Sequence, residues 1–520
     1  MSLKNNVILI ILDGWGISKK KKGNAIFLAK TPNIDNYLKK YPQTKLFCHG
    51  KHVGLPDNQD GNSEAGHTNL GAGRIVLQDS VYISKSIKDG TFFKNTAFIE
   101  AIKHTKKHKS SMHLMGLLSG QESPHSYPEH LYGIFDLMKR EKVKPVYLHL
   151  FTDGRDSSPH GAVRLLRDLK KGFKNGEVVA SICGRFYAMD RKKNWENIER
   201  AYNLLTLGEG IRVESSEEAI TKAYNQELTD EFILPSVVMG DRGRPRATIE
   251  DNDSVIFFNL RSDRSRELTK AFVQEGFEEL NKGAFERKKI PKNIRFVAMT
   301  DFGPDLSGVL TAYPSRDIMN SLPFVLKNHS QLYLAEEEKY AHITFFFNGG
   351  WEGPVASEER IKIPSPNVKH YEEVPEMSAR EVTKVLIEKI KSKECNFICV
   401  NYANPDMIGH TGNLEAGIKC CEIIDKLTGQ VVQAALKNNF VSIITSDHGN
   451  IEEMEIPETE EIDTKHSKFK VPFIIISNKK ELKQLDFKKR GVLGDVAPTI
   501  LHLMGIDKPK EMTRDSLIIN

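Results

Sequence analysis

The sequence has 520 residues, of which 39% are hydrophobic and 28% charged, so it predicts a folded protein and excludes a disordered one. This length favours two domains, because single cores rarely grow beyond about 300 residues. A net charge of +5 is small for the length and does not favour a nucleic-acid-binding protein, while leaving room for a local basic pocket for an acidic substrate.

No segment suggests a membrane protein. The apolar run at residues 7–12 is too short for a signal sequence, and nothing approaches the ~18 apolar residues that span a bilayer. The cysteines form no CxxC pair, so we expect them to be reduced and the protein to be cytoplasmic. They are Cys48, Cys183, Cys395, Cys399, Cys420 and Cys421.

The first predicted strand ends in an acidic residue. Residues 7–12 are continuously apolar, which is typical of a strand buried on both faces of a parallel sheet. Asp13 follows at the strand end, where functional groups lie in such sheets, so it is a candidate metal ligand. A turn-forming aspartate is the alternative. A helix capped near Thr31 and Pro32 is expected within residues 24–40.

A glycine-flanked polar stretch follows at residues 60–67. Ser63 lies in it just before a predicted helix, where free backbone N–H groups favour an anion. Ser63 is therefore a candidate to hold a phosphoryl group, and the alternative is an ordinary helix N-cap. Residues 75–79 are expected to lead out of this first unit.

From about residue 80, short apolar runs alternate with helical patterns, which predicts a second α/β unit with a parallel-rich sheet. The expected strands are residues 111–118, 146–151, 178–182, 255–259 and 296–299, and the expected helices are 132–141, 161–175 and 194–205. A glycine- and proline-rich crossover is expected at residues 304–314.

The C-terminal part returns to buried strands. We expect strands at residues 343–347, 397–400, 441–445 and 471–476, and a helix at residues 378–391 that begins with a capping signal. Two of these strands run directly into polar turns. The first turn contains Asp406 and His410, and the second contains Asp447 and His448.

These turns indicate a metal centre. Asp406 and His410 are four residues apart, so a helical turn would place both side chains on one face. Carboxylate and imidazole ligands suit Mn, Zn or Fe. Together with Asp13 and His466 they provide enough ligands for two divalent ions, which we favour over a purely structural network. Two ions about 4 Å apart would stabilise an in-line phosphoryl displacement and activate the Ser63 hydroxyl.

The middle unit carries arginines in the turns after its strands, and guanidinium groups bind phosphate and carboxylate in bidentate fashion. These arginines predict a pocket for an anionic substrate, and surface salt bridging is the alternative. They are Arg155, Arg185, Arg191, Arg261 and Arg264. His125 lies in a nearby polar loop and could donate to the substrate.

At this point the motifs resemble a known family, the cofactor-independent phosphoglycerate mutases of the alkaline phosphatase superfamily, nearly from end to end. The matching motifs are residues 12–16 (LDGWG), 61–67 (GNSEAGH), 152–156 (TDGRD), 184–191 (GRFYAMDR), 338–342 (EKYAH), 377–380 (MSAR), 404–412 (NPDMIGHTG) and 446–450 (SDHGN). The resemblance implies an alkaline-phosphatase-like parallel-rich sheet domain, residues 1–77 and 312–520, with a second α/β substrate-binding domain, residues 78–311, inserted into it.

The resemblance also implies residue roles. Asp406, His410 and His466 would hold one Mn²⁺, and Asp13, Ser63, Asp447 and His448 the other. Ser63 would become phosphoserine, Asp156 would be the acid/base toward the glycerate hydroxyls, and Lys339 would face the phosphate. The implied substrate contacts are His125, Arg155, Asp156, Arg185, Arg191, Arg261, Arg264 and Lys339.

The sequence departs from the family pattern at a few positions. Ala65 stands where the family usually has valine, and residues 465–467 read Lys-His-Ser instead of Ala-His-Thr. Residues 192–195 lack the usual aspartate and arginine, and residues 300–310 are also atypical. We therefore expect differences in the details of the substrate domain and the hinge.

The implied reaction interconverts 3-phosphoglycerate and 2-phosphoglycerate in glycolysis and gluconeogenesis, without 2,3-bisphosphoglycerate. A mutase must exclude water between its two transfer steps, which would explain two domains that close, with chain crossings near residues 76–80 and 308–314. A monomer is expected, with no nucleic-acid or membrane partner. The alternatives are a metal-dependent phosphatase or phosphopentomutase of the same superfamily, and a phospho-ligand-binding protein without activity.

Overall fold

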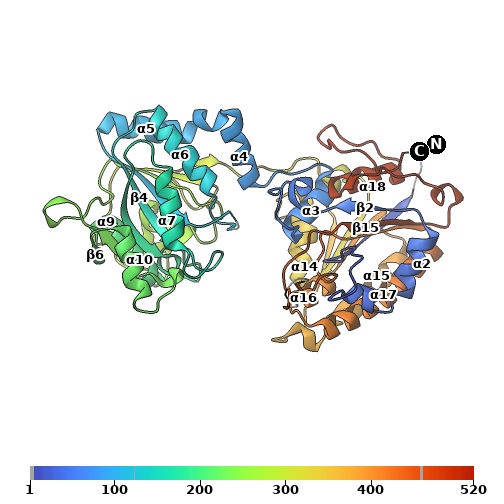
Figure 1. Cartoon of the computed structure of the whole chain (residues 1–520). Helices are drawn as coiled ribbons and strands as arrows, with labels where there is room; N and C mark the ends of the chain where they lie inside the picture. Colours follow the sequence, from blue (N-terminus) through green and yellow to red (C-terminus); the bar gives the residue numbers. More distant parts are fainter. Residues whose placement is uncertain (1–4, 122, 457–458, 460, 520) are drawn as a thin grey trace. The chain divides into compact units, whose positions relative to one another are not determined.

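The computed structural model describes residues 5–121, 123–456, 459 and 461–519. The chain forms two compact units: unit 1 comprises Met1–Gln78 and Arg316–Asn520, and unit 2 comprises Asp79–Ser315 (Figure 1). Strand β10 (Val309–Tyr313) pairs with β9 (Arg295–Thr300) in the sheet of unit 2, so the chain returns to unit 1 a few residues after position 311. Within the described residues, no helix is both long and apolar enough to cross a membrane.

Unit 1 is built on an eight-stranded sheet whose first five strands are parallel. In spatial order the strands are β12 (Glu359–Ile363), β11 (Gln331–Glu336), β13 (Phe397–Tyr402), β1 (Asn6–Leu12), β14 (Phe440–Thr445), β15 (Val471–Ile476), β2 (Gln43–Phe47) and β16 (Gly491–Val492). β15 runs antiparallel to both of its neighbours. The predicted strands at residues 7–12, 397–400, 441–445 and 471–476 are confirmed.

The uninterrupted apolar sequence of β1 follows from its burial on both faces. Ile8, Ile10 and Leu12 face one core, which α15 (Ala379–Ser392) and α17 (Leu414–Lys437) cover. The alternate residues of β1 face a second core, covered by α3 (Ser63–Ala72) and α18 (Val496–Met504) on the opposite side of the sheet (Figure 1). Since side chains alternate along a strand, a strand between two helical layers must be apolar at every position.

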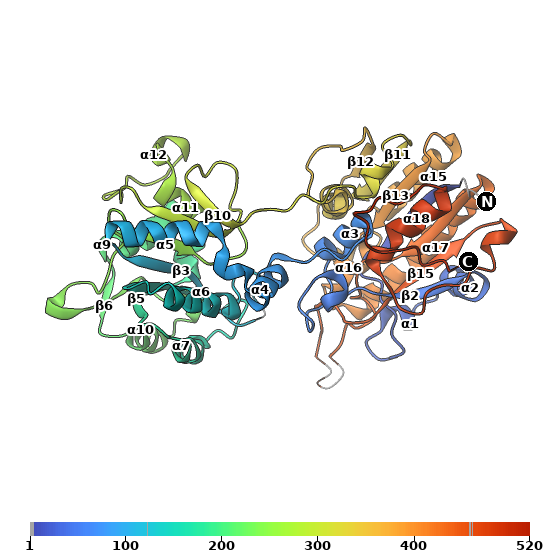
Figure 2. The same cartoon turned by 90° about the horizontal axis from the view of Figure 1, so that it is seen from above.

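Unit 2 repeats this layered plan with its own eight-stranded sheet (Figure 2). In spatial order its strands are β10, β9 (Arg295–Thr300), β8 (Ser254–Phe257), β3 (Met112–Leu118), β4 (Val146–Thr152), β5 (Val178–Gly184), β7 (Ser236–Val238) and β6 (Ile211–Val213). Only the β5–β7 pair is antiparallel. One face is covered by α5 (Thr96–His108), α6 (Pro128–Arg140), α7 (Ala162–Lys171) and α10 (Ser216–Tyr224), and the other by α9 (Trp195–Leu207), α11 (Arg266–Val273) and α12 (Phe277–Leu280).

A chain of polar side chains crosses the apolar sheet of unit 2 on the face covered by α9 and α11. Asp253, just before β8, lies 3.1 Å from His113 Nε2 on β3. His113 Nδ1 lies 2.9 Å from His149 Nε2 on β4, and His149 Nδ1 lies 2.7 Å from Ser181 Oγ on β5. All four residues are buried, so these hydrogen bonds link four adjacent strands inside a dry core.

The predicted strand at residues 343–347 is wrong. The strand of this region is β11, and the chain then forms helix α14 (Glu337–Ala341) and the π-helical turn η5 (His342–Phe346). Aromatic and β-branched composition suggested a strand, but Ile343 and Phe347 are four residues apart and are both buried beside α3. The apolar residues of this segment are thus buried at a helical spacing, because tertiary packing overrides the local preference for a strand.

Two helix starts also differ from expectation in detail. The region 24–40 forms two helices, α1 (Ala25–Leu28) and α2 (Pro32–Lys40), because the residue before a proline is driven out of helical geometry. Ser378 precedes α15 as predicted but makes no side-chain cap, since its hydroxyl donates to the carbonyl of Pro364.

Candidate active site

Three adjacent strands of unit 1 end in the predicted metal ligands. β13, β1 and β14 are neighbours and parallel, so the residues that follow them lie at the same edge of the sheet. Asp13 follows β1, and Asp447 and His448 follow β14. After β13 the chain forms the short helix α16 (Asn404–Gly409), which carries Asp406 and confirms the predicted helical turn.

Ser63 lies at the centre of these strand ends. It is the first residue of α3, and the N-cap is Asn62, whose side chain accepts from the Ala65 N–H at 2.8 Å, so the alternative reading of Ser63 as the cap is wrong. The Ser63 hydroxyl oxygen lies 2.9 Å from His448 Nε2 and 2.7 Å from Lys339 Nζ. The hydroxyl is thus free of a capping role and is placed between an imidazole and an ammonium group.

Close approach of α3 to the end of β14 requires glycine. A Cβ atom at Gly66 would lie 2.7 Å from the Asp447 carbonyl oxygen and 2.8 Å from its Cβ. Any larger residue would push the first turn of α3, and with it Ser63, away from Asp447. The glycine after the serine therefore sets the depth of the hydroxyl in the site.

Three buried carboxylates surround one buried ammonium group. Lys339 Nζ lies 2.8 Å from Asp13 Oδ1 and 2.6 Å from Asp406 Oδ2. Burial and the Asp447 carboxylate raise the pKa of Asp13 to about 6, despite the opposing effect of Lys339. Burial alone would raise the pKa of Asp406 as well, but Lys339 and His448 hold it well below its ordinary value. The negative charge of this site exceeds what one lysine neutralises.

Unit 2 gathers a second set of predicted residues around Arg185. Its Nη1 donates to Asp153 Oδ1 at 2.6 Å and to Asp156 Oδ2 at 2.7 Å, and Asp156 also accepts from the Ser123 hydroxyl at 3.0 Å. His125 is buried beside this pair, and burial together with the Arg185 charge lowers the pKa of His125 to about 4. Among the described residues, Arg185 Nε and His125 Nδ1 are buried without a hydrogen-bond partner. These two groups are therefore available to hydrogen-bond a ligand.

The other predicted arginines of unit 2 are more exposed than Arg185. Arg191 lies 2.9 Å from Asp263, and Arg264 donates to the Met189 carbonyl at 3.1 Å. Burial lowers the pKa of Arg264, and Arg185, Arg191 and Arg155 lower it further, so these guanidinium groups share one positive field. Arg155 and Arg261 are about half exposed and face Glu231 and Asp263 at 3.6 and 4.0 Å. Partly exposed cations around the buried Arg185 suit an anionic ligand.

The structure thus divides the predicted residues into two clusters, one per unit. The unit 1 cluster comprises Asp13, Ser63, Lys339, Asp406, His410, Asp447, His448 and His466, and the unit 2 cluster comprises His125, Arg155, Asp156, Arg185, Arg191, Arg261 and Arg264.

Comparison with known proteins agrees with this geometry. Residues 5–508 match the Metalloenzyme superfamily. The 2,3-bisphosphoglycerate-independent phosphoglycerate mutase of Clostridium novyi is 46% identical over 518 residues, which is 99% of each chain, and that of Clostridioides difficile is 47% identical over 521 residues, again 99% of each. This chain belongs to the 2,3-bisphosphoglycerate-independent phosphoglycerate mutase family.

A solved structure gives the same result. The Leishmania mexicana phosphoglycerate mutase, crystallised at low cobalt concentration, matches with a TM-score of 0.71 and 29% identity, and covers 99% of this chain and 98% of its own. The predicted α/β, alkaline-phosphatase-like class is confirmed, and so is the resemblance to the cofactor-independent phosphoglycerate mutases. Membership of this metalloenzyme family implies divalent metal ions.

The histidines of unit 1 fit such ions. His410 and His466 each donate Nδ1–H to a backbone carbonyl, of Thr464 and Gly61 respectively, both at 2.8 Å. In the neutral imidazole this leaves the lone pair on Nε2, and the two Nε2 atoms lie 3.0 Å apart and 3.3 and 3.2 Å from Asp406 Oδ1. Facing lone pairs need a proton or a cation between them. Carbonyl groups that fix the imidazole tautomer in this way are typical second partners of metal-binding histidines.

Two overlapping donor groups result. Asp406, His448 and His466 offer ligand atoms within 4.8 Å of one another, and so do Asp13, Asp447 and His448. Burial lowers the pKa of His448 to about 3, against the effect of Asp447, so the imidazole is neutral and has a lone pair available. The mixed oxygen and nitrogen donors of the described residues suit first-row divalent metals.

The sequence reasoning missed two residues that support this site. Asn401 Nδ2 donates to Asp13 Oδ2 at 2.7 Å and lies 3.0 Å from His67 Nε2, while His67 Nδ1 lies 2.9 Å from the Ser63 carbonyl. All are buried. A polar residue inside the apolar strand β13 was an available signal for Asn401, because buried strands carry amides only where partners exist.

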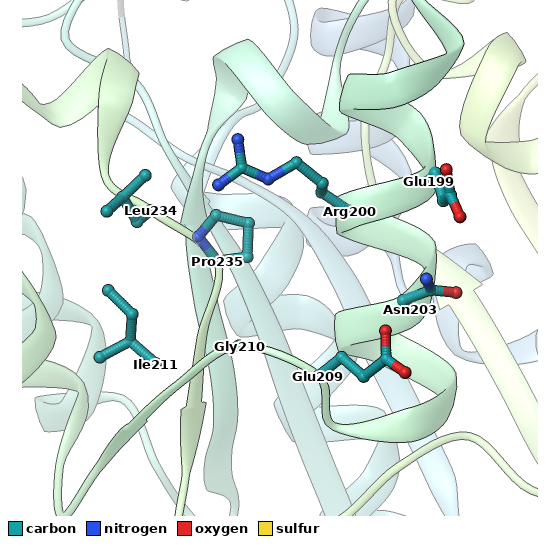
Figure 3. A pocket seen from close by; sticks show the side chains of 8 residues that line it. All are labelled: Glu199, Arg200, Asn203, Glu209, Gly210, Ile211, Leu234 and Pro235. Carbon is teal, nitrogen blue, oxygen red and sulfur yellow. The ribbon is translucent and has the colours of Figure 1, made fainter.

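Unit 2 also contains a hollow that the predicted site residues do not line. That hollow has a volume of about 350 Å³ and lies between α9 and the segments before β6 and β7 (Figure 3). It is lined by Glu199, Arg200, Asn203, Glu209, Gly210, Ile211, Leu234 and Pro235. None of the predicted site residues is among these eight, so this hollow is separate from the arginine cluster.

Proposed function

We propose that this protein interconverts 3-phosphoglycerate and 2-phosphoglycerate in glycolysis and gluconeogenesis, without 2,3-bisphosphoglycerate. The full-length relatives carry the name of this activity. The observation that carries the proposal is the Ser63 hydroxyl, 2.9 Å from His448 Nε2 and 2.7 Å from Lys339 Nζ, among three buried carboxylates.

Ser63 is the proposed nucleophile. Its oxygen attacks phosphorus and the bond from phosphorus to the glycerate oxygen breaks, so that phosphoserine forms and the serine proton passes overall to that glycerate oxygen. The other glycerate hydroxyl then attacks the phosphorus, the bond to the Ser63 oxygen breaks, and the proton returns to Ser63. Lys339 is placed to stabilise the charge on the transferring phosphoryl oxygens, because its ammonium group already touches the Ser63 oxygen. In this role the buried lysine remains charged: burial lowers its pKa, but Asp13 and Asp406 raise it by more.

The site is proposed to bind two divalent ions, Mn²⁺ in preference to others. Asp406, His410 and His466 would hold one, and Asp13, Ser63, Asp447 and His448 the other. When bound, the ions supply positive charge that lowers the pKa of the Ser63 hydroxyl and neutralises the phosphoryl oxygens.

Unit 2 is proposed to hold the glycerate. Arg185 Nε and His125 Nδ1 are buried groups that can hydrogen-bond the glycerate. Positive charge comes from the partly exposed guanidinium groups of Arg155, Arg191, Arg261 and Arg264. Asp156 is the proposed acid/base toward the glycerate hydroxyls. Burial raises its pKa, but the Arg185 and Ser123 hydrogen bonds outweigh burial and lower it, so the carboxylate is ionised and ready to accept a proton.

We further propose that residues 1–77 and 312–520 act as the phosphoryl-transfer domain and residues 78–311 as the glycerate-binding domain. A cytoplasmic monomer with no nucleic-acid partner completes the proposal. The modest net charge and the six buried, unpaired cysteines support a reducing compartment and a small-molecule substrate.

The test is Ser63→Ala, followed by ³¹P NMR with 3-phosphoglycerate. We expect loss of 2-phosphoglycerate formation by at least a factor of about 10⁴, because no other side chain takes the phosphoryl group. Ser442→Ala is the matched control, since Ser442 is buried in β14 with no partner for its hydroxyl among the described residues. Both variants should unfold at wild-type temperatures. Substantial mutase activity in Ser63→Ala would refute the phosphoserine route, and release of inorganic phosphate alone by the wild type would favour a phosphatase.

A further inference from the structure

Glu452 is a buried carboxylate that is not itself a predicted metal ligand but contacts the loops that carry the ligands. It is 1% exposed and follows the turn that carries Asp447 and His448. Its Oε2 accepts from the backbone N–H groups of Gly16 and Asn450, each at 2.9 Å. Its Oε1 accepts a short hydrogen bond from the Ser467 hydroxyl.

These three donors come from three different ligand loops. Gly16 lies three residues after Asp13, Asn450 two residues after His448, and Ser467 directly after His466. One carboxylate thus ties together the segments that carry ligands from β1, from β14 and from the loop before β15. The Ser467 N–H also donates to the Gly449 carbonyl at 2.9 Å, which joins the second and third loops directly.

The surroundings of Glu452 are shaped for this contact. A Cβ atom at Gly16 or at Gly449 would clash with the Glu452 carboxylate, and at Gly449 it would also clash with the Ser467 hydroxyl. Only glycine at both positions lets the backbone approach so closely. The contact therefore depends on four residues from three loops, Gly16, Gly449, Glu452 and Ser467, and is buried.

We propose that Glu452 and Ser467 are positioning residues that set the affinity for the ion held by Asp406, His410 and His466. The inference rests on the two-ion site proposed above. His466 approaches that ion from a loop, and it is fixed on one side by its Nδ1 hydrogen bond to the Gly61 carbonyl. On the other side it is fixed by the bond from Ser467 to Glu452. This assigns a role to the Lys-His-Ser sequence at residues 465–467: serine keeps the hydroxyl that threonine provides in the resembled family.

The experiment compares Ser467→Ala with Ser467→Thr and with the control Ser442→Ala. Mn²⁺ is titrated into each chelator-stripped protein, and free Mn²⁺ is followed by electron paramagnetic resonance. We expect two ions in the wild type, and in Ser467→Ala a Kd for one of them that is weaker by about 10-fold or more, with the other unchanged. Ser467→Thr should restore wild-type binding.

A second measurement separates positioning from a merely structural role. Unfolding temperature is recorded for each variant with and without excess Mn²⁺, because an ion that binds only the folded state raises it. A structural role would lower both temperatures equally, whereas positioning reduces the increment that Mn²⁺ adds. If Ser467→Ala binds both ions with wild-type affinity, or if Mn²⁺ raises its unfolding temperature by as much as in the wild type, the inference is overturned but the proposed function is not. If the wild type binds no ions, the proposed function fails with it.

Discussion

Replacement of Lys339 by methionine tests the electrostatics of the unit 1 site. The ammonium group is buried, 2.8 Å from Asp13 Oδ1 and 2.6 Å from Asp406 Oδ2, and methionine keeps the stem but removes the charge. Removal of one partner of a buried ion pair costs about 3 kcal/mol or more, since it leaves an uncompensated buried charge. For a unit of this size, about 3 kcal/mol lowers the unfolding temperature by about 6 °C.

The assay is thermal unfolding at pH 8 with chelator and, separately, with excess Mn²⁺. In chelator we expect the full loss of stability in Lys339→Met. With Mn²⁺ the loss should be smaller, because divalent ions compensate the same carboxylates. Lys384→Met, at an exposed lysine of α15, is the control and should change little in either condition. An equal loss with and without Mn²⁺, or none in chelator, would refute the view that lysine and metal share one set of carboxylates.

Two further predictions concern unit 2. Arg185→Lys keeps a cation near Asp153 and Asp156 but removes the buried Nε donor. We therefore expect kcat/KM to fall by ~30-fold, which corresponds to about 2 kcal/mol of transition-state stabilisation, mainly through a higher KM. An unchanged KM for 3-phosphoglycerate would contradict this prediction. Burial, and then the Asp190 carboxylate, raise the pKa of Glu267 from 4.5 to about 7. The contribution of the protonated carboxyl group to the free energy of unfolding is therefore fully present below pH 4.5 and is lost as pH rises through 7. Glu267→Gln should therefore raise the free energy of unfolding by about 2 kcal/mol at pH 8 and barely change it at pH 4.5 in urea denaturation; parallel pH profiles for the two proteins would exclude this.

Local patterns predicted much of the fold because the decisive signals are short in range. Continuous apolar runs identified β1, β13, β14 and β15 as strands buried on both faces, and the spacing of Asp406 and His410 identified a helical turn. Both rules rest on the geometry of a few consecutive residues. The misassigned strand at residues 343–347 shows the limit, since its conformation is decided by packing against α3.

The site was less accessible to such rules. Ser63 and Asp13 could be proposed from their positions at a helix start and a strand end. Lys339 gives no comparable signal, because β11 before it was not predicted, and its role came from family resemblance alone. Glu452 was missed entirely: its importance lies in three backbone loops that meet only in the folded chain, and nothing in the sequence near residue 452 records that meeting.

The polar chain through the sheet of unit 2 has a direction. Asp253 accepts from His113 Nε2, and in the neutral form of His113 this leaves Nδ1 as the acceptor. His149 Nε2 then donates to that acceptor and His149 Nδ1 accepts the Ser181 proton, so the two rings share one tautomer and one orientation along the strand order. Each proton is thus assigned by its neighbour, starting from a single carboxylate. An apolar side chain in place of either ring would leave a buried nitrogen of the other ring without its partner.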